Sequence, residues 1–151
     1  MKVIVFFTVM LTILTSTFAQ SDDMTVTKSF LIVKSTKSYQ SALKTANSVS
    51  EKFKYQLKLN GNIEDKENGL TSLDTCDCGE QHGYVPRGRY DDGIYVSIEY
   101  SSYFEGFSPG YYIVVVASGA NNKLISTLNQ VVLEYDDAYI KTALVYMGCM
   151  H

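Results

Sequence analysis

Residues 110–146 read GYYIVVVASGANNKLISTLNQVVLEYDDAYIKTALVY, which predicts a strand, a helix and a second strand in that order. The apolar run at 110–118 and the alternating run at 138–146 are typical of strands, and the residues between them have helical spacing. Residues 29–60 carry the same order nearer the N-terminus. Because a doubled β-α-β unit indicates one compact sandwich, the sequence predicts a single domain.

Each predicted helix has one apolar face. The first follows Ser38, which we expect to be its N-cap. Its apolar residues recur at three- and four-residue spacing: Tyr39, Ala42, Leu43, Ala46, Val49 and Phe53. The second follows Gly119 and spans 121–135, with the same spacing in Leu124, Ile125, Leu128, Val131, Val132 and Tyr135. Both helices are therefore expected to bury one face only.

Alternation predicts which side of each strand is buried. In residues 55–60 the apolar side chains Tyr55, Leu57 and Leu59 share one face, and Gln56 and Lys58 lie opposite. In residues 94–101 the expected inner side chains are Ile94, Val96, Ile98 and Tyr100, with Tyr95, Ser97 and Glu99 outside. This strand is expected to pair with 111–118 through the turn-rich loop 103–110.

These elements predict an α+β, ferredoxin-like two-layer sandwich in the order β-α-β, insertion, β-β-α-β. Its mostly antiparallel sheet of four or five strands would have both helices on one face. The other face is expected to be polar, tyrosine-bearing and open to a ligand. The polar residues 61–93 are predicted to form a long insertion between the two units.

Residues 1–19 have the features of an export signal. Lys2 gives a positive start, and the apolar run 3–14 is too short for a membrane span of about 20 residues. Residues 17–19 (TFA) form a small-x-small cleavage site. We therefore expect one mature domain, 20–151, that is secreted or periplasmic and has neither a lipid attachment site nor a membrane span.

The charge balance is acidic. The chain has 13 Lys and Arg residues against 16 Asp and Glu residues, a net charge of −3, and removal of Lys2 would make it more negative. Because nucleic-acid-binding proteins usually have a basic excess, nucleic acid is not expected as a partner. The sequence leaves the oligomeric state open.

The doubled unit also resembles a known family. A short apolar strand, a helix that begins a few residues later, and a second strand with the pattern Asp137-Ala138-Tyr139-Ile140 are similar to the sporulation-related repeat (SPOR) domain. The resemblance covers most of residues 29–60 and 110–147. It implies a ferredoxin-like sandwich of four antiparallel strands and two helices, whose exposed sheet face binds peptidoglycan glycan strands, particularly those without peptide stems.

Tyrosine is frequent, with 12 residues and no Trp. Aromatic rings can cover the apolar face of a sugar while neighbouring polar groups bind its hydroxyls. On the face expected to be open, the candidate ligand-binding residues are Gln56, Lys58, Tyr95, Ser97, Glu99, Tyr139 and Lys141. The alternative is that these tyrosines reflect β-propensity and half-buried packing.

The segment RGRYDDG, residues 87–93, places Arg87 and Arg89 beside two carboxylates, just before a strand. Arginine forks suit carboxylates or phosphates, so both arginines are candidate ligand-binding residues. The alternative is a local ion-pair cluster in which Asp91, Asp92 and Gly93 form a turn.

Catalysis is not expected. His82 with Asp91, Asp92 or Glu105 would be the acid-base candidates. The sequence has no nucleophile motif, phosphate loop or paired-carboxylate signature. It therefore predicts a protein that is not an enzyme and needs no cofactor.

Cysteine and histidine form two clusters, CDCGEQH at 76–82 and CMH at 149–151. An odd number of cysteines cannot be fully paired. One interpretation is a disulfide between Cys149 and Cys76 or Cys78, which would tie the insertion to the end of the last strand. The alternatives are a metal site, which would also use His82, and free or redox-active thiols.

The sequence thus predicts an exported, non-catalytic binding protein for peptidoglycan or another cell-envelope glycan. One alternative is a secreted module that binds another protein through residues 87–92 and 103–112. A second alternative is a metal- or thiol-dependent protein that uses Cys76, Cys78, His82 and Cys149.

Overall fold

Residues 25–73 and 84–147 are described by a computed structural model of the chain. The helices are α1 (Tyr39–Phe53) and α2 (Asn121–Val131), with a short 3-10 helix η1 (Ser101–Tyr103). The strands are β1 (Thr25–Thr36), β2 (Asn62–Asp65), β3 (Gly69–Ser72), β4 (Gly93–Tyr100), β5 (Tyr112–Gly119) and β6 (Tyr139–Tyr146).

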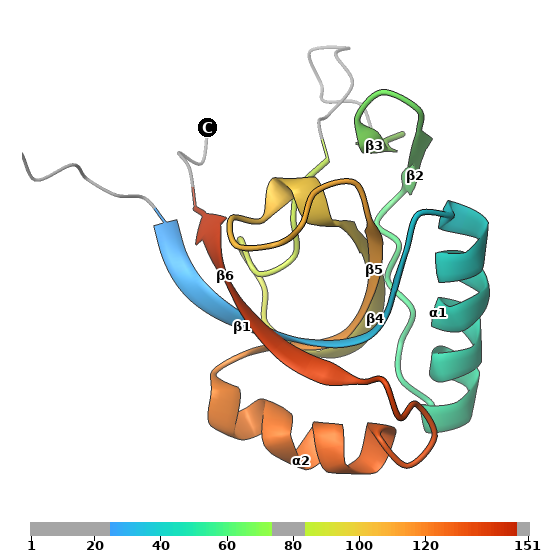
Figure 1. Ribbon diagram of the computed structural model, residues 1–151, viewed down its shortest axis with the longest axis vertical. Helices are drawn as coiled ribbons and strands as arrows, with labels where there is room; N and C mark the ends of the chain where they lie inside the picture. The colour runs from blue at the N-terminus through green and yellow to red at the C-terminus, as the bar shows by residue number, and fades with distance from the viewer. Residues whose placement is uncertain (1–24, 74–83, 148–151) are drawn as a thin grey trace, which may run out of the picture.

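Four strands form one antiparallel sheet in the order β4-β5-β1-β6, and β2 and β3 form a separate hairpin. Both helices pack on one face of the main sheet, α1 across β4, β5 and β1, and α2 across β1, β5 and β6 (Figure 1). The α+β two-layer sandwich predicted from the sequence is confirmed. Its strand order and its helices are compatible with a ferredoxin-like fold, in which β4 is the second strand.

The predicted strand at 55–60 is wrong. Lys54, with a left-handed φ of 59°, ends α1, and Asn60 and Gly61, also at positive φ, turn the chain into β2. Between these turns the chain pairs with β4 only around Leu57, through the Lys58 N–H to the Val96 carbonyl and the Val96 N–H to the Gln56 carbonyl, both at 2.8 Å. One point of pairing is too little for a strand, so β4 occupies the second-strand position instead.

The face of the sheet that carries the helices matches the periodicity of the sequence. Ser38 is the N-cap of α1, because its Oγ accepts a hydrogen bond from the Ser41 N–H at 3.3 Å. The helices contribute buried side chains to the core beneath them: Tyr39, Ala42, Ala46, Val49, Leu124, Thr127 and Val131. α2 ends before the predicted residue 135, and Ile125 and Val132 of its predicted apolar face are exposed.

The opposite face is not open, which corrects the prediction of a free polar surface. The sheet curves strongly, and residues 84–92 and 101–111 cross its concave side (Figure 1). A second buried cluster lies there: Phe30, Ile32, Phe104, Ile113, Val115, Ala143 and Val145. The physical reason lies in β1 and β5, whose continuous apolar runs place apolar side chains on both faces, so both faces need a cover. Irregular pairing in β1 and β4 accompanies the curvature.

The hairpin β2-β3 is an addition to the sandwich within the predicted insertion. Leu70 buries its side chain in the helix-side core, and the Tyr112 hydroxyl donates to the Gly69 carbonyl at 3.0 Å. Within 25–73 and 84–147, no helix is long and apolar enough to cross a membrane.

Candidate ligand site in the concave face of the sheet

Three predicted ligand-binding residues of β4 lie on the face away from the helices, but they are buried. Tyr95, Ser97 and Glu99 are only 4%, 2% and 4% exposed. The prediction that they form an open surface is wrong, because residues 84–92 cover them. Ile94, expected inside, is exposed, since the register of β4 against β5 shifts between Ile94 and Ser97.

Arg87 is the anchor of this covering segment, not a surface ligand-binding residue. Its guanidinium is 3% exposed and donates five hydrogen bonds within the protein. The acceptors are Ser118 Oγ (3.0 Å), Ser97 Oγ (3.0 Å) and the carbonyls of Tyr95 (2.8 Å), Val115 (3.1 Å) and Gly93 (2.8 Å). It also lies 3.5 Å over the ring of Tyr95. Because Arg87 is buried and its guanidinium is bonded to these internal acceptors, we do not assign it to an external ligand.

Glu99 completes the anchor. Its carboxylate accepts from the Arg87 N–H at 3.1 Å and from the Tyr84 hydroxyl. Burial raises the pKa of Glu99 above its ordinary value and lowers the pKa of Arg87, because both charged forms have lost their water. Burial likewise raises the pKa of the Tyr84 hydroxyl well above its ordinary value. Four residues predicted to bind a ligand therefore hold the segment 84–92 on the sheet: Arg87, Tyr95, Ser97 and Glu99.

The remaining charged residues of this segment also bind within the protein. Arg89 donates from Nε to the Met147 carbonyl at 3.0 Å, which links the segment to the end of β6. Asp91 accepts from the Tyr95 hydroxyl, and Asp92 pairs with Lys28 at 2.5 Å. Asp91 and Asp92, considered above as acid-base candidates, thus have structural partners, whereas His82 lies outside the described residues.

Gln56 and Lys58 lie beside β4, away from the other candidates. Gln56 is exposed, and the Lys58 amine lies 4.3 Å from the centre of the Tyr95 ring. Neither lines a described pocket with Tyr139 or Lys141. The seven residues predicted to share one sheet face therefore do not form a single site.

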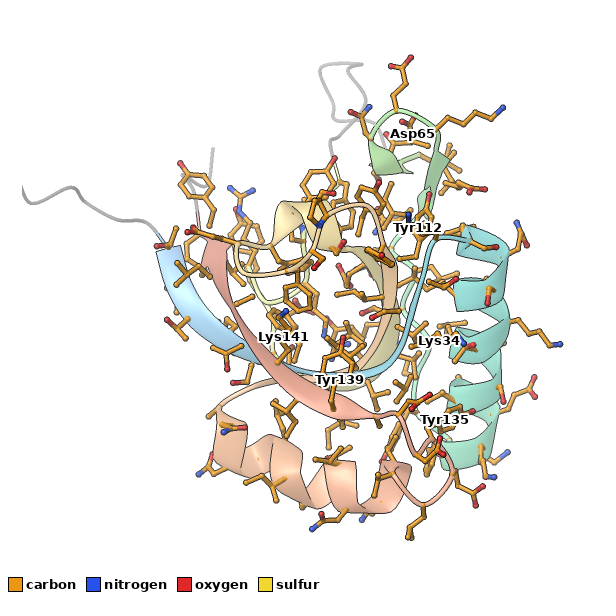
Figure 2. The ribbon with its side chains drawn as sticks, in the orientation of Figure 1. Lys34, Asp65, Tyr112, Tyr135, Tyr139 and Lys141 are labelled. Carbon is orange, nitrogen blue, oxygen red and sulfur yellow. The ribbon has the colours of Figure 1, made fainter. Side chains whose placement is uncertain are left out.

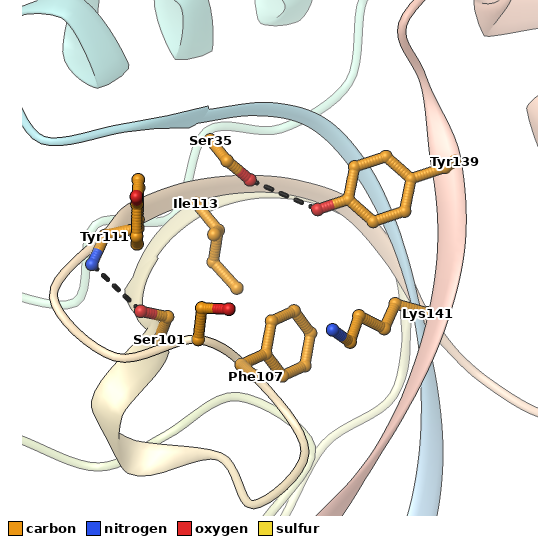
Figure 3. A pocket seen from close by; sticks show the side chains of 8 residues that line it. Ser35, Ser101, Phe107, Tyr111, Ile113, Tyr139 and Lys141 are labelled. Atoms are coloured by element: carbon orange, nitrogen blue, oxygen red, sulfur yellow. Dashed lines mark hydrogen bonds between the residues drawn. The ribbon is translucent and has the colours of Figure 1, made fainter.

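Tyr139 and Lys141 do lie together. They project from β6 into the concave side of the sheet (Figure 2) and line a pocket of about 200 Å³. Ala143 and Val145, the next residues on that face of β6, continue into the buried cluster. The lining residues come from three strands, η1 and the loop that follows η1 (Figure 3): Ser35, Ser101, Phe107, Ser108, Tyr111, Ile113, Tyr139 and Lys141. We refer to this site as the concave pocket.

Both hydroxyl groups and aromatic rings line the concave pocket (Figure 3). Ser35 Oγ and the Tyr139 hydroxyl lie 3.2 Å apart and share a hydrogen bond. The Lys141 amine lies over the Phe107 ring, 4.8 Å from its centre. Phe107 in turn packs edge-on against Phe30 of the buried cluster. The pocket therefore combines an aromatic wall, packed against the buried cluster, with several polar groups.

Two serines hold the loop 104–111 in the shape that closes the concave pocket. Ser101 Oγ accepts from the Tyr111 N–H at 2.9 Å, and Ser102 Oγ accepts from the Gly110 N–H at 3.0 Å. Gly110 has a φ of 85°, a conformation that favours glycine. This turn brings Tyr111 and Phe107 beside the strands.

The sequence identified Tyr139 and Lys141 as candidate ligand-binding residues, and it gave Phe107, Ser108 and Tyr111 only as part of the loop 103–112 in the alternative of a protein-binding module. The sequence contains one indication of these residues, because the turn-rich loop 103–110 places serine and aromatic residues between two predicted strands. The path of that loop across the concave face decides which of them meet β6, and alternation along strands does not encode it.

The cysteine and histidine clusters, with the expected disulfide and the alternative metal site, lie outside the described residues. In the part of the chain that the structure describes, no group of three or more His, Cys, Asp or Glu side chains is placed to hold a metal ion. Glu105, the last acid-base candidate, is exposed and pairs through its backbone carbonyl with the Leu144 N–H at 3.2 Å.

Comparisons with protein-family models, with curated proteins and with solved structures found no match. The resemblance to the SPOR family therefore stays a prediction. The function has to be argued from the concave pocket itself.

Proposed function

We propose that this protein is a non-catalytic binder of cell-envelope glycan, with peptidoglycan as the first candidate, and that one sugar residue enters the concave pocket. The observation that carries the proposal is the lining of the pocket, where Phe107, Tyr111 and Tyr139 lie among the hydroxyls of three serines. Rings cover the apolar face of a sugar, and hydroxyls both donate to and accept from its hydroxyls.

The size of the pocket supports a single ring. Its volume of about 200 Å³ is below the roughly 300–1,000 Å³ of pockets for drug-sized ligands. At about 30 Å³ per water molecule, it would hold about seven waters, which one sugar residue can displace. A glycan chain would therefore place one residue inside and its neighbours along the rim.

The polar groups of the pocket are suited to binding. A hydroxyl has one donor and two acceptor sites, so Ser35 and Tyr139 keep capacity for a ligand after they bond to each other. No Asp, Glu, His or Cys is among the described lining residues, so these residues do not include the side chains most often used as general acids, general bases or activated thiols. Binding without catalysis fits this set of groups best.

The cellular place of the protein is part of the proposal. The predicted export signal would deliver the domain to the compartment where envelope glycans occur. The resemblance to the SPOR family adds peptidoglycan as the specific candidate. In this protein the ligand would bind in the concave pocket and not across an open sheet.

Co-sedimentation with isolated peptidoglycan sacculi, with and without removal of the peptide stems by an amidase, tests the proposal. We expect the mature protein to sediment with sacculi and Tyr139→Ala to weaken this about tenfold, through loss of one aromatic contact and one hydroxyl. The matched control is Tyr90→Ala, which removes a 53% exposed tyrosine outside the pocket and should leave binding unchanged. Absence of wild-type binding to both preparations, or equal binding of wild type and Tyr139→Ala, would contradict the proposal.

A further inference from the structure

Lys141 is a cation whose partner in the structure is an aromatic ring. Its amine lies 4.8 Å from the centre of the Phe107 ring, and the residue is partly buried. The ion pairs within residues 25–73 and 84–147 are Lys28 with Asp92 and Lys52 with Glu134, so no described carboxylate neutralises Lys141. An ammonium group that no carboxylate of residues 25–73 and 84–147 neutralises is available to an anionic ligand.

The surroundings of Lys141 are locally positive in an acidic protein. Of the eight described residues that line the concave pocket, Lys141 is charged and none is acidic. A second amine, that of Lys37, lies 5.6 Å from the centre of the ring of Tyr111, which is itself a lining residue. The whole chain has a net charge of −3, so the sign at the pocket is opposite to that of the protein. A positive concave site on an acidic protein favours entry of anions.

We propose that the concave pocket selects sugars that carry a carboxylate, and that Lys141 binds this carboxylate; the inference rests on the proposed glycan-binding function. Tyr139 and Lys141 are two residues apart on one face of β6, which separates them by about 7 Å along the strand. The pair Ser35 and Tyr139 binds ring hydroxyls at one end, while the amine of Lys141 binds the acidic substituent at the other.

A carboxylate fits better than a phosphate group. Among the described residues that line the pocket none is an arginine, and phosphate sites commonly add a guanidinium fork or several backbone N–H groups at a helix N-terminus. One lysine amine and neutral hydroxyls match a single negative charge. The ligand class is therefore a sugar that carries a carboxylate.

Calorimetric titration of the mature protein with three probes, glucuronate, glucose and glucose 6-phosphate, tests the inference. We expect glucuronate to bind about tenfold to a hundredfold more tightly than glucose, the range of a charge-assisted hydrogen bond, and more tightly than glucose 6-phosphate. Lys141→Met and Lys141→Gln should reduce glucuronate binding to the level of glucose without changing glucose binding. The control Lys44→Gln alters an exposed lysine of α1 and should change neither.

The outcomes separate the inference from the function on which it rests. Equal wild-type affinity for glucose and glucuronate overturns the carboxylate selectivity and leaves glycan binding standing. Tighter binding of glucose 6-phosphate overturns the choice of carboxylate over phosphate. An unchanged preference for glucuronate in a folded Lys141→Gln variant overturns the role of Lys141. Absence of binding of all three probes, together with failure to sediment with sacculi, overturns both proposals. The wild-type comparison remains decisive even if a Lys141 variant does not fold.

Discussion

Replacing Arg87 by alanine should release residues 84–92 from the concave face of the sheet and strongly destabilise the fold. The guanidinium donates to three backbone carbonyls and two serine hydroxyls and lies over the Tyr95 ring. In the Arg87→Ala variant these acceptors lose a donor in a region with little access to water. Glu99 would at the same time remain buried without its positive neighbour.

The expected loss follows from the number and burial of these contacts. Breaking a buried charged network by removing one partner costs about 3–5 kcal/mol, a large part of the roughly 5–15 kcal/mol that stabilises a typical domain. At about 3 °C per kcal/mol for a chain of this size, the melting temperature should fall by roughly 10–15 °C. Arg87→Lys keeps the charge but has three donors for five acceptors, so an intermediate loss is expected.

Urea unfolding followed by circular dichroism measures these differences. Arg89→Ala is the matched control, because Arg89 is partly exposed and its side chain makes a single hydrogen bond to a described residue, the Met147 carbonyl. We expect that variant to lose only about 1 kcal/mol. If Arg87→Ala lost no more than Arg89→Ala, the argument that Arg87 anchors the covering segment would be refuted.

Two further predictions concern Glu99 and Gly69. Glu99 has a raised pKa in the folded chain, mainly through burial. As the pH rises past 4.5, the ordinary pKa of this side chain, Glu99 therefore loses its proton in the unfolded chain before it does so in the folded chain. The free energy of unfolding should therefore fall as the pH rises, by at most about 1.4 kcal/mol per pH unit, until the pH passes the pKa of Glu99 in the folded chain. The Glu99→Gln variant should lack this slope. Parallel pH profiles of the two proteins would contradict the assignment of the slope to Glu99. Gly69→Ala should lose about 2–4 kcal/mol, because φ is +80° and the new Cβ would lie 2.4 Å from the Tyr100 ring. The Cβ of Gly93→Ala meets nothing within 4 Å, so that variant should lose only the backbone strain of its φ of +135°, about 1–3 kcal/mol. A Gly69→Ala loss no larger than this in thermal melts would show that the contact with Tyr100 is unimportant.

Periodicity predicted the helix-bearing half of the fold well. The three- and four-residue spacing in α1 and the N-cap Ser38 are local features, and both are confirmed. Alternation also placed Tyr95, Ser97 and Glu99 correctly on the face away from the helices. Local pattern fixes the direction of a side chain in a strand, because successive residues point to opposite faces.

Alternation could not predict what covers that face. Arg87 reaches three backbone carbonyls, and hydrogen bonds to backbone leave no pattern in the sequence. The strand predicted at 55–60 failed for a related reason, since its alternation is real but the turns on either side leave room for pairing only around Leu57. Part of the lining of the concave pocket could be predicted from the sequence. Tyr139 and Lys141 follow from the alternation of β6. Ser35 meets Tyr139 through the pairing of β1 with β6, and Phe107 and Tyr111 reach the pocket only through the path of the loop 104–111.

The most direct test of sugar binding in the concave pocket is a nuclear magnetic resonance titration of isotope-labelled mature protein with soluble peptidoglycan glycan fragments. We predict saturable shifts of amide signals around the pocket, at Ser35, Tyr111, Tyr139 and Lys141. Saturable shifts confined to another surface, such as the hollow beside the start of α2 lined by Ile94 and Lys123, would contradict this account, and so would the absence of any shift at millimolar ligand.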